Sequence, residues 1–296
     1  MAVNDMSLAG KVCVVTGGNS GIGYETVREL AHRGATVALV ARDAAKANAA
    51  AARIRDEHPS GHVDVLIADL SSLEAVRGLA NAIHASYSRL DILVNNAGLM
   101  IDRRRLTPDG YETTFAVNYL APFLLTHLLL DRLKESAPSR IVNVSSAAHT
   151  GGRLRWSDYE GAWSRGGWRA YNDSKLALIM FTFELAHRLK GTGVTVNAVH
   201  PGVIASNFAQ EQGNVSGLFF RWFKPFLLSP SKGAQTQLRV ATDPALESVT
   251  GAYFANGRPR KAAARAYNEL DALHLWDLTM RLVGEDEAMP QKSAGA

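Results

Sequence analysis

The chain has 296 residues, of which 47% are hydrophobic and 20% are charged, which is the composition of an ordinary soluble globular protein. Its net charge of +4 suits an anionic cofactor, and we expect no nucleic-acid partner, because the short basic runs at 103–105 and 258–261 are typical of solvated loops. The single cysteine, Cys13, excludes an intramolecular disulfide and a cysteine-based zinc site, and its apolar neighbours indicate an inert core thiol.

From Lys11 to about residue 200, short runs of β-branched residues alternate with longer helical patterns. The predicted strands are 12–15, 36–40, 63–67, 92–95, 141–144 and 194–199. The predicted helices are 24–32, 44–57, 73–86, 111–134 and 171–190. This alternation predicts one α/β domain over residues 1–296, with a doubly wound (Rossmann) parallel sheet of about seven strands and helices on both faces.

Two stretches depart from the alternation. Residues 151–169 hold three tryptophans among Gly, Arg and Asp residues and are expected to form a long loop. Residues 203–232, which we assign as a substrate loop or lid within the domain, carry an apolar run at 218–228. That run is too short to span a bilayer, so it is a packing helix, a lid over a substrate or a contact with a membrane surface.

The ends of the sequence bear on location. The N-terminal residues lack the charged start and apolar stretch of a secretory signal. No apolar run approaches the roughly 20 residues that a membrane helix needs. We therefore expect a cytoplasmic protein without a membrane span, with a disordered tail at 289–296.

A glycine-rich turn follows the first predicted strand and leads into a helix. Glycines let the chain turn tightly and let backbone N–H groups approach a pyrophosphate at the helix N-terminus. This strand–turn–helix setting predicts dinucleotide binding. The binding residues expected in the turn are Gly17, Asn19, Ser20, Gly21, Ile22 and Gly23.

The residues after the second predicted strand bear on which dinucleotide binds. Folds that hold NAD place an acidic residue there for the ribose hydroxyls, whereas this chain has Ala41 followed by Arg42. A guanidinium suits a 2′-phosphate, so we expect NADP(H), with NAD(H) as the second choice. Asp43 keeps NAD(H) open, but we favour an N-cap of the next helix for it. After the third strand, Asp69 and its neighbour Leu70 are expected at the adenine.

Other predicted strands also end in residues that suit ligand binding. The fourth ends in Asn95-Asn96-Ala97-Gly98, the fifth in Ser145-Ser146 and the sixth in His200-Pro201-Gly202. Ligands of open α/β sheets bind at this carboxyl edge, and small residues let the chain pass close to a cofactor. The cofactor contacts expected here are Asn96, Ala97, Gly98, Pro201, Gly202 and Val203.

Tyr171 and Lys175 are four residues apart, which puts both side chains on one face of a helix. A phenol has an ordinary pKa of about 10, and a nearby ammonium lowers that pKa because it favours the phenolate. Most such pairs on surface helices do no chemistry, so the pair is a candidate only in its context. Asn118 lies inside a helical pattern, although asparagine is a mediocre helix former. It is therefore either a surface polar residue or a functional residue.

Together these motifs resemble the short-chain dehydrogenase/reductase family in order and approximate spacing, over nearly the whole chain. The resemblance implies that Tyr171 protonates the carbonyl oxygen in reduction, and that Lys175 lowers the pKa of Tyr171 and binds the nicotinamide ribose. It also implies that Ser146, rather than Ser145, hydrogen-bonds the substrate oxygen, and that Asn118 holds a water that feeds protons through Lys175. No metal is expected, because the nine histidines show no metal-ligand spacing.

Several segments are similar to the retinol-dehydrogenase branch of that family. They are residues 126–130, 134–146 and 233–236, and Tyr253-Phe254, which would lie in a last strand. Membrane-anchored members of the branch begin with an apolar anchor that is not found at the start of this sequence. Soluble bacterial ketoreductases of the same branch, which act on bulky secondary metabolites such as anthracycline ketones, are an equally good comparison.

The resemblance implies an NADP(H)-dependent oxidoreductase that interconverts a carbonyl and an alcohol. The stretches 151–168 and 203–228 favour a bulky, mostly apolar substrate: retinal-like, steroid-like or a polyketide ketone. The alternatives are an NAD(H)-dependent alcohol dehydrogenase of the same family, an epimerase or dehydratase of its extended relatives, and a nucleotide-sensing binding protein on the same fold. Family members often associate through the helices that contain Asn118 and Tyr171, so the resemblance also implies a homo-oligomer.

Overall fold

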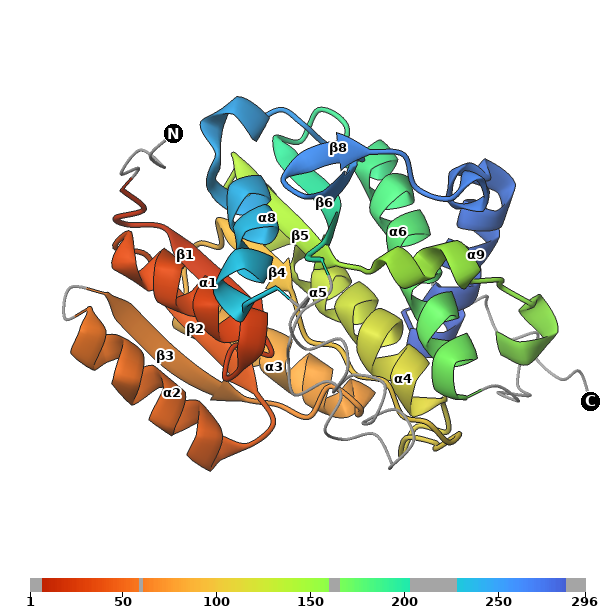
Figure 1. The fold of residues 1–296 in the computed structure, drawn as a ribbon, viewed down its shortest axis with the longest axis horizontal. Coiled ribbons are helices and arrows are strands. Elements are labelled where there is room, and N and C mark those ends of the chain that lie inside the picture. The colour runs from red at the N-terminus through yellow and green to blue at the C-terminus, as the bar shows by residue number, and fades with distance from the viewer. Residues whose placement is uncertain (1–6, 59–60, 160–165, 203–227, 286–296) are drawn as a thin grey trace, which may run out of the picture.

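The computed structural model describes residues 7–58, 61–159, 166–202 and 228–285, which form one sheet with helices on both faces (Figure 1). The strands are β1 (Val12–Thr16), β2 (Thr36–Ala41), β3 (His62–Ile67), β4 (Ile92–Asn95), β5 (Ser139–Val144), β6 (Val194–His200), β7 (Tyr253–Ala255) and β8 (Arg258–Arg260). Their order in the sheet is β3-β2-β1-β4-β5-β6-β7-β8. Strands β1 to β3 are added toward one edge of the sheet and β4 to β8 toward the other, so the order of the strands reverses between β1 and β4. Ligands of open α/β sheets bind at such a switch point.

The predicted fold class is confirmed, with eight strands in place of about seven. Strands β1 to β7 pair in parallel, and β8 pairs antiparallel with β7. The prediction of a solvated loop at 258–261 was wrong for β8, although all three of its residues are exposed. Pro259 is tolerated because β8 is an edge strand, where a missing N–H leaves no partner unpaired.

The helices divide between the two faces of the sheet (Figure 1). One face is covered by α1 (Gly21–His32), α2 (Ala44–Glu57) and α8 (Pro230–Thr242). The other is covered by α3 (Leu73–Ser86), α5 (Ala121–Glu135), α6 (Gly167–Arg188) and α9 (Glu269–Val283). In β1, Cys13 and Val15 join the first core and Val12 and Val14 the second, so the strand is buried throughout, as parallel strands are. Cys13 is the predicted inert core thiol, and burial raises its pKa.

The helix predicted at 111–134 starts later and is irregular. It consists of α4 (Thr113–Phe115), a π-helical turn η1 (Ala116–Leu120) and α5. It begins where the Glu112 carboxylate accepts a hydrogen bond from the N–H of Phe115 at 2.8 Å. Hydrophobic periodicity gives no sign of a π-helical turn, because the turn adds one residue without changing the apolar composition.

Helix α6 starts at Gly167, four residues before the predicted start at Tyr171. Gly167 has a positive φ of 62°, which a residue with a side chain adopts only with strain. The end of the loop predicted at 151–169 is therefore helical, and Tyr171 lies in the second turn of α6 rather than opening it. Another part of that stretch belongs to η2, a 3-10 helix at Ala147–Gly151.

Helix α9 packs on α5 and α6 through Trp276, whose ring centroid lies 5.0 Å from that of Phe123 and 6.0 Å from that of Phe181. This surface is part of the one that we expected to serve self-association, and α9 covers it here. Among the described residues, the stretch Thr113–Glu135 is apolar and long enough to span a membrane, but 83% of its most apolar window is buried. Such burial is typical of the core helix of a globular protein.

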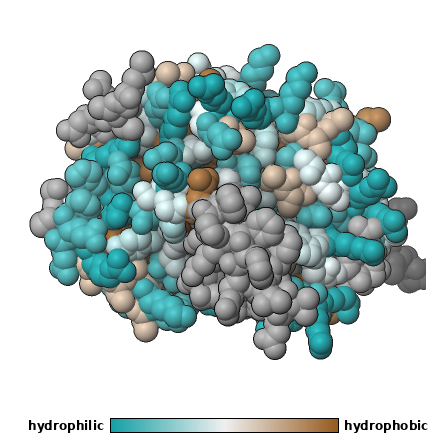
Figure 2. Space-filling view, in the orientation of Figure 1, coloured by the Kyte–Doolittle hydropathy of each residue, from teal (hydrophilic) through white to brown (hydrophobic). Residues whose placement is uncertain are grey.

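The described part of the face in Figure 2 is mainly hydrophilic, with apolar side chains scattered over it. The large apolar residues that are exposed in the described ranges are Ile67, Leu106, Trp168, Tyr267, Leu270 and Leu273. Most of the predicted substrate loop at 203–232, the cofactor residue Val203 and the tail at 289–296 lie outside the described residues.

Candidate active site

The four residues predicted to be catalytic meet at the carboxyl edge of the sheet, beside β4 and β5. Tyr171 forms a side-chain hydrogen bond with Ser146, and the ammonium of Lys175 lies 5.7 Å from the centroid of the Tyr171 ring. A Cβ on Gly98 would lie 3.3 Å from Lys175 Nζ and 3.4 Å from Asn118 Oδ1. Because Gly98 has no side chain, both the ammonium of Lys175 and the amide of Asn118 can lie close to the backbone at this position.

Burial controls the protonation of the Tyr171–Lys175 pair. Burial raises the pKa of Tyr171 above its ordinary value, and the hydrogen bond with Ser146 acts in the opposite direction. Lys175 is only 4% exposed, and burial lowers its pKa from 10.5 to about 8. Its ammonium donates a hydrogen bond to the carbonyl oxygen of Val144 at 2.9 Å. Without cofactor, then, Ser146 is the group that favours the phenolate of Tyr171, and an effect of Lys175 on that phenol stays a prediction.

Ser145 and Ser146 follow β5 and have different partners. The hydroxyl of Ser145 donates to the carbonyl oxygen of Lys175 at 3.0 Å and is buried. Ser146 is half-buried, and its Oγ accepts from the N–H of Ala148 at 3.2 Å while bonding to Tyr171. Of the two serine hydroxyls, that of Ser146 therefore lies at the phenol, and its role toward a substrate oxygen stays a prediction.

Asn118 is fully buried in the π-helical turn, so its interpretation as a surface polar residue was wrong. Its Oδ1 accepts from the N–H of Leu99 at 2.8 Å, and its Nδ2 donates to Leu99 O at 2.9 Å and Ser174 Oγ at 3.1 Å. The hydroxyl of Ser174 donates to Tyr171 O at 2.7 Å. Asn118 thus connects the loop after β4 to the helix that carries Tyr171, and its role toward a water stays a prediction.

The glycine-rich turn forms a cradle at the N-terminus of α1. Gly17 has a positive φ of 66°, and a Cβ on Gly23 would come within 2.1 Å of Gly17 O. Ser20 is the N-cap of α1, yet its side chain makes no cap hydrogen bond. The first N–H groups of α1 can therefore donate to another acceptor. The residues therefore fit the pyrophosphate of a dinucleotide.

The other predicted cofactor residues lie along the same edge. Arg42 is exposed directly after β2, and Asp43 caps α2 through a 3.0 Å bond from the N–H of Lys46, as we expected. Asp69 is exposed and accepts from the N–H of Ser71 at 3.0 Å, with Leu70 half-buried beside it. Beyond β6 the chain continues into Pro201 and into Gly202, whose φ is 91°.

Two residues that support the cofactor cradle were missed from the sequence. Thr16 Oγ1 accepts from the N–H groups of Asn96 and Ala97 at 3.0 Å each, and Asn96 Nδ2 donates to Thr16 O at 2.8 Å and Gly17 O at 3.3 Å. Gln237 of α8 is fully buried, and its Nε2 donates to Asn96 Oδ1 at 3.5 Å. A hydroxyl on the last residue of β1 is a signal that could have identified Thr16. Gln237 lies 141 residues from Asn96, and no sequence signal connects them.

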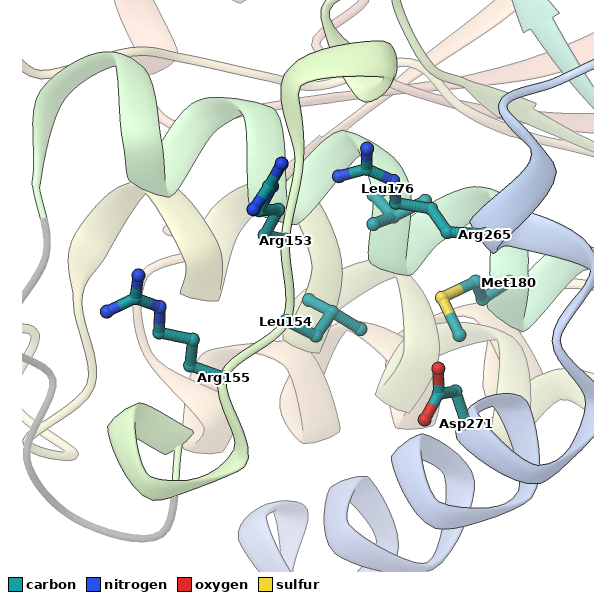
Figure 3. Close-up of a pocket in the computed structure, with 7 residues that line it drawn as sticks. All are labelled: Arg153, Leu154, Arg155, Leu176, Met180, Arg265 and Asp271. Carbon is teal, nitrogen blue, oxygen red and sulfur yellow. The ribbon is translucent and has the colours of Figure 1, made fainter.

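A hollow of about 320 Å³ lies between the segment after η2, α6 and the start of α9 (Figure 3). Its lining residues are Arg153, Leu154, Arg155, Leu176, Met180, Arg265 and Asp271. None of them is a predicted site residue, and in Figure 3 the side chain of Arg155 points away from Met180 and Asp271. Within the described ranges, no three His, Cys, Asp or Glu side chains gather so as to hold a metal ion.

Fold and site together define a nicotinamide-dependent oxidoreductase architecture, and sequence comparison gives the family. The family described as short chain dehydrogenase matches residues 11–215. Retinol dehydrogenase 12 of Mus musculus is 45% identical over 284 residues, which cover 96% of this chain and 90% of that protein. Human retinol dehydrogenase 11 is 44% identical over 288 residues, which cover 96% and 89%.

The chain therefore belongs to the short-chain dehydrogenase/reductase family of oxidoreductases, which act on CH–OH groups. Within that family it falls in the retinol-dehydrogenase-like branch.

Solved structures agree with this assignment. An uncharacterized protein from Mycobacterium paratuberculosis is similar at a TM-score of 0.77, with 35% identity and coverage of 94% of this chain and 95% of that one. Pseudomonas aeruginosa RhlG, in an active-site complex with NADP, is similar at a TM-score of 0.69, with 30% identity and coverage of 84% and 96%.

The depressed pKa of Lys175 predicts how the stability of the cofactor-free chain depends on pH. Since the folded pKa of about 8 lies below the ordinary value of 10.5, the unfolded chain binds more protons between those values, and the free energy of unfolding rises with pH there. Below pH 8 the folded protein carries the whole cost of burying the charge, roughly 3 kcal/mol. Replacing Lys175 by Met removes this cost but loses the charged hydrogen bond to Val144 O, which contributes about 2 kcal/mol.

We therefore expect Lys175→Met to raise the free energy of unfolding at pH 7 by about 1 kcal/mol, measured by urea denaturation of the cofactor-free protein. The exposed Lys190, just beyond the C-terminal end of α6, provides the control, and Lys190→Met is expected to leave stability unchanged. A loss of stability in Lys175→Met at pH 7 would show that the buried ammonium stabilises the fold.

Proposed function

We propose that this chain is an NADP(H)-dependent oxidoreductase that interconverts a carbonyl and an alcohol on a bulky, mostly apolar substrate, with Tyr171 as the general acid and base. The proposal rests above all on the cluster of Tyr171, Ser146, Lys175 and Asn118, which supplies an acid, a hydrogen-bond donor and a buried cation around one point. When bound, the nicotinamide supplies or accepts the hydride.

In reduction, the phenol of Tyr171 gives its proton to the carbonyl oxygen, and in oxidation it takes a proton from the alcohol. The raised pKa keeps the phenol protonated near neutral pH, which suits the role of acid. The Ser146 hydroxyl already bonds to Tyr171, so a substrate oxygen at the same place would receive hydrogen bonds from both. The pKa of Lys175, about 8, is close to neutral pH. Lys175 can therefore pass a proton toward the phenol, or bind the ribose as a cation.

The choice of NADP(H) rests on Arg42. It follows β2 directly, where the ribose of the adenosine half lies in folds of this kind, and it is exposed. The carboxylate that would bind the ribose hydroxyls of NAD is replaced there by Ala41, while Asp43 is used as the cap of α2. RhlG, whose complex contains NADP, supports the same choice.

The apolar substrate class rests on Trp168 and on the relatives. Trp168 is 52% exposed, and its ring lies edge-on to that of Tyr171, with 5.7 Å between the centroids. An indole placed beside the proton donor offers an apolar wall to a substrate whose oxygen bonds to Tyr171. The retinol dehydrogenases that the chain resembles support a bulky apolar molecule of that kind.

A cytoplasmic location and a homo-oligomeric state stay predictions. Cell fractionation tests the first, and light scattering of the purified chain tests the second. Association through the outer surface of α5 and α6 is disfavoured by α9, whose Trp276 already packs there.

Replacing Tyr171 by Phe removes the acidic proton and little else. We expect Tyr171→Phe to lower kcat for carbonyl reduction by about a thousandfold, which is within the usual contribution of general acid–base catalysis. The dissociation constant for NADPH, measured by fluorescence, is expected to stay within about twofold because the phenyl ring remains. Tyr87→Phe, which loses a hydroxyl bonded to Asp64 instead, is the matched control and should keep full activity. Full activity in Tyr171→Phe would exclude Tyr171 as the acid.

Replacing Arg42 by Ala tests the preference for NADP(H). We expect Arg42→Ala to weaken NADPH binding by roughly 10- to 100-fold, the usual effect of losing a hydrogen bond to a charged group, and to leave NADH nearly unchanged. Arg28→Ala is the control, since Arg28 pairs with Glu25 on α1 at 2.7 Å. Equal losses for the two nucleotides would contradict a 2′-phosphate at Arg42.

Replacing Trp168 by Ala tests the apolar wall. We expect Trp168→Ala to raise KM roughly 10- to 100-fold for a large apolar ketone, because burying the exposed half of an indole contributes about 2 kcal/mol of binding free energy. KM for a small ketone and for NADPH should not change. Trp156→Ala is the matched control, because the ring of Trp156 packs against that of His274, with 4.4 Å between the centroids. An equal rise in KM for the two ketones would place Trp168 outside the substrate site.

A further inference from the structure

His149 lies three residues after Ser146, in the 3-10 helix η2, and is only 2% exposed. Its Nδ1 lies 2.7 Å from the carbonyl oxygen of Ser146, and its Nε2 lies 3.0 Å from the backbone N of Ala263. Ala263 belongs to the link between β8 and the 3-10 helix η7 (Ala264–Tyr267), 114 residues further along the chain. One imidazole thus connects the turn that carries Ser146 to the C-terminal part of the molecule.

The two contacts fix the protonation and tautomer of this imidazole. A carbonyl oxygen can only accept a hydrogen bond, so Nδ1 must carry the proton that it donates to Ser146 O. A backbone N–H can only donate, so Nε2 must be unprotonated to accept from Ala263. Both bonds exist together only in the neutral Nδ1–H form.

The surroundings of His149 favour that neutral form. Burial lowers the pKa of His149, and burial together with the nearby His149 lowers that of His200 at the end of β6. Tyr253 of β7 lies edge-on to the imidazole, with ring centroids 4.9 Å apart, and burial raises its pKa to about 12. Neither neighbour carries a negative charge that would stabilise an imidazolium near neutral pH.

The turn held by His149 is the one that orients the Ser146 hydroxyl. The carbonyl of Ser146 accepts from the backbone N–H of His149 at 3.2 Å as well as from the ring, and its Oγ accepts from the N–H of Ala148 at 3.2 Å. With its carbonyl held by two donors, Ser146 has little freedom to rotate its backbone, and its hydroxyl stays on Tyr171.

We infer that His149 is a positioning residue, which in its neutral Nδ1–H form bridges Ser146 O and the N–H of Ala263 and so keeps the Ser146 hydroxyl at the reacting oxygen. The inference rests on the proposed function, since it assigns His149 to the same reaction. It gives the C-terminal link a role in the site, through the bond from the N–H of Ala263 to the imidazole.

Two substitutions separate positioning from simple packing. His149→Phe keeps a ring against Tyr253 but loses both hydrogen bonds, and we expect kcat for carbonyl reduction to fall about tenfold, as for the loss of one well-placed bond. His149→Asn places an amide N–H where Nδ1 was, which restores the bond to Ser146 O but not the one from Ala263, so kcat should recover to within about threefold of the unmodified chain. The dissociation constant for NADPH should change less than about twofold in both, because no cofactor contact is altered.

The control is His84→Asn, since His84 Nε2 also lies within hydrogen-bond distance of a carbonyl, Leu128 O at 3.0 Å, but between α3 and α5. It should leave kcat unchanged. A normal kcat in a folded His149→Phe, or a fall in His149→Asn as large as in His149→Phe, would overturn the inference. A circular dichroism melt establishes that each variant is folded.

The tautomer itself can be observed without measuring the activity of any variant. In a ¹⁵N-histidine spectrum, with the His149 signals assigned by their loss in His149→Asn, we expect a protonated Nδ1 and an unprotonated Nε2 near pH 7. A protonated Nε2 would overturn the inference whatever the kinetics show. If the unmodified chain reduces no carbonyl compound, the proposed function fails, and the tautomer alone then decides whether His149 forms this bridge.

Discussion

The buried ammonium of Lys175 is the constraint on which the candidate site depends. Burial alone brings its pKa to about 8, and its ammonium bonds to the carbonyl of Val144 at the end of β5. Such a charge is tolerated only where the surrounding backbone is fixed, because a mobile neighbour would admit water or lose the bond. The parallel sheet supplies that rigidity, since β4 and β5 end side by side beneath the lysine.

The residues around Lys175 are held by contacts that are themselves remote from the chemistry. The π-helical turn presents Asn118 to the loop after β4 and to Ser174, while Gly98 leaves room for the lysine and the asparagine together. On the opposite side, His149 fixes the Ser146 turn to Ala263. The site is therefore tied to backbone groups of Leu99, Ser146 and Ala263, whose positions vary little with side-chain motion.

The same logic extends to the cofactor cradle. The glycines of the first turn permit the close approach of Gly17 and Gly23, but Thr16 and Asn96 determine how the turn sits on the end of β4. Gln237 of α8 then contacts Asn96 from the far side. Because α8 begins within residues 203–232, the stretch that we predict to be the substrate loop leads directly into a helix that contacts the cofactor cradle.

The sequence by itself determined the class of sheet, the glycine cradle, the cap at Asp43 and the spacing of Tyr171 and Lys175, because these depend on local periodicity and on neighbouring residues. The tertiary structure decided the π-helical turn at Asn118, the early start of α6, the strand β8 and the roles of Thr16, Gln237 and His149. Apart from β8, which forms a hairpin with the preceding β7, these features follow from contacts between distant segments, as between His149 and Ala263, and such contacts leave no periodic trace in the chain. Tyr171 and Lys175 were visible as a pair, but their protonation was not, because burial sets it and burial exists only in the folded molecule.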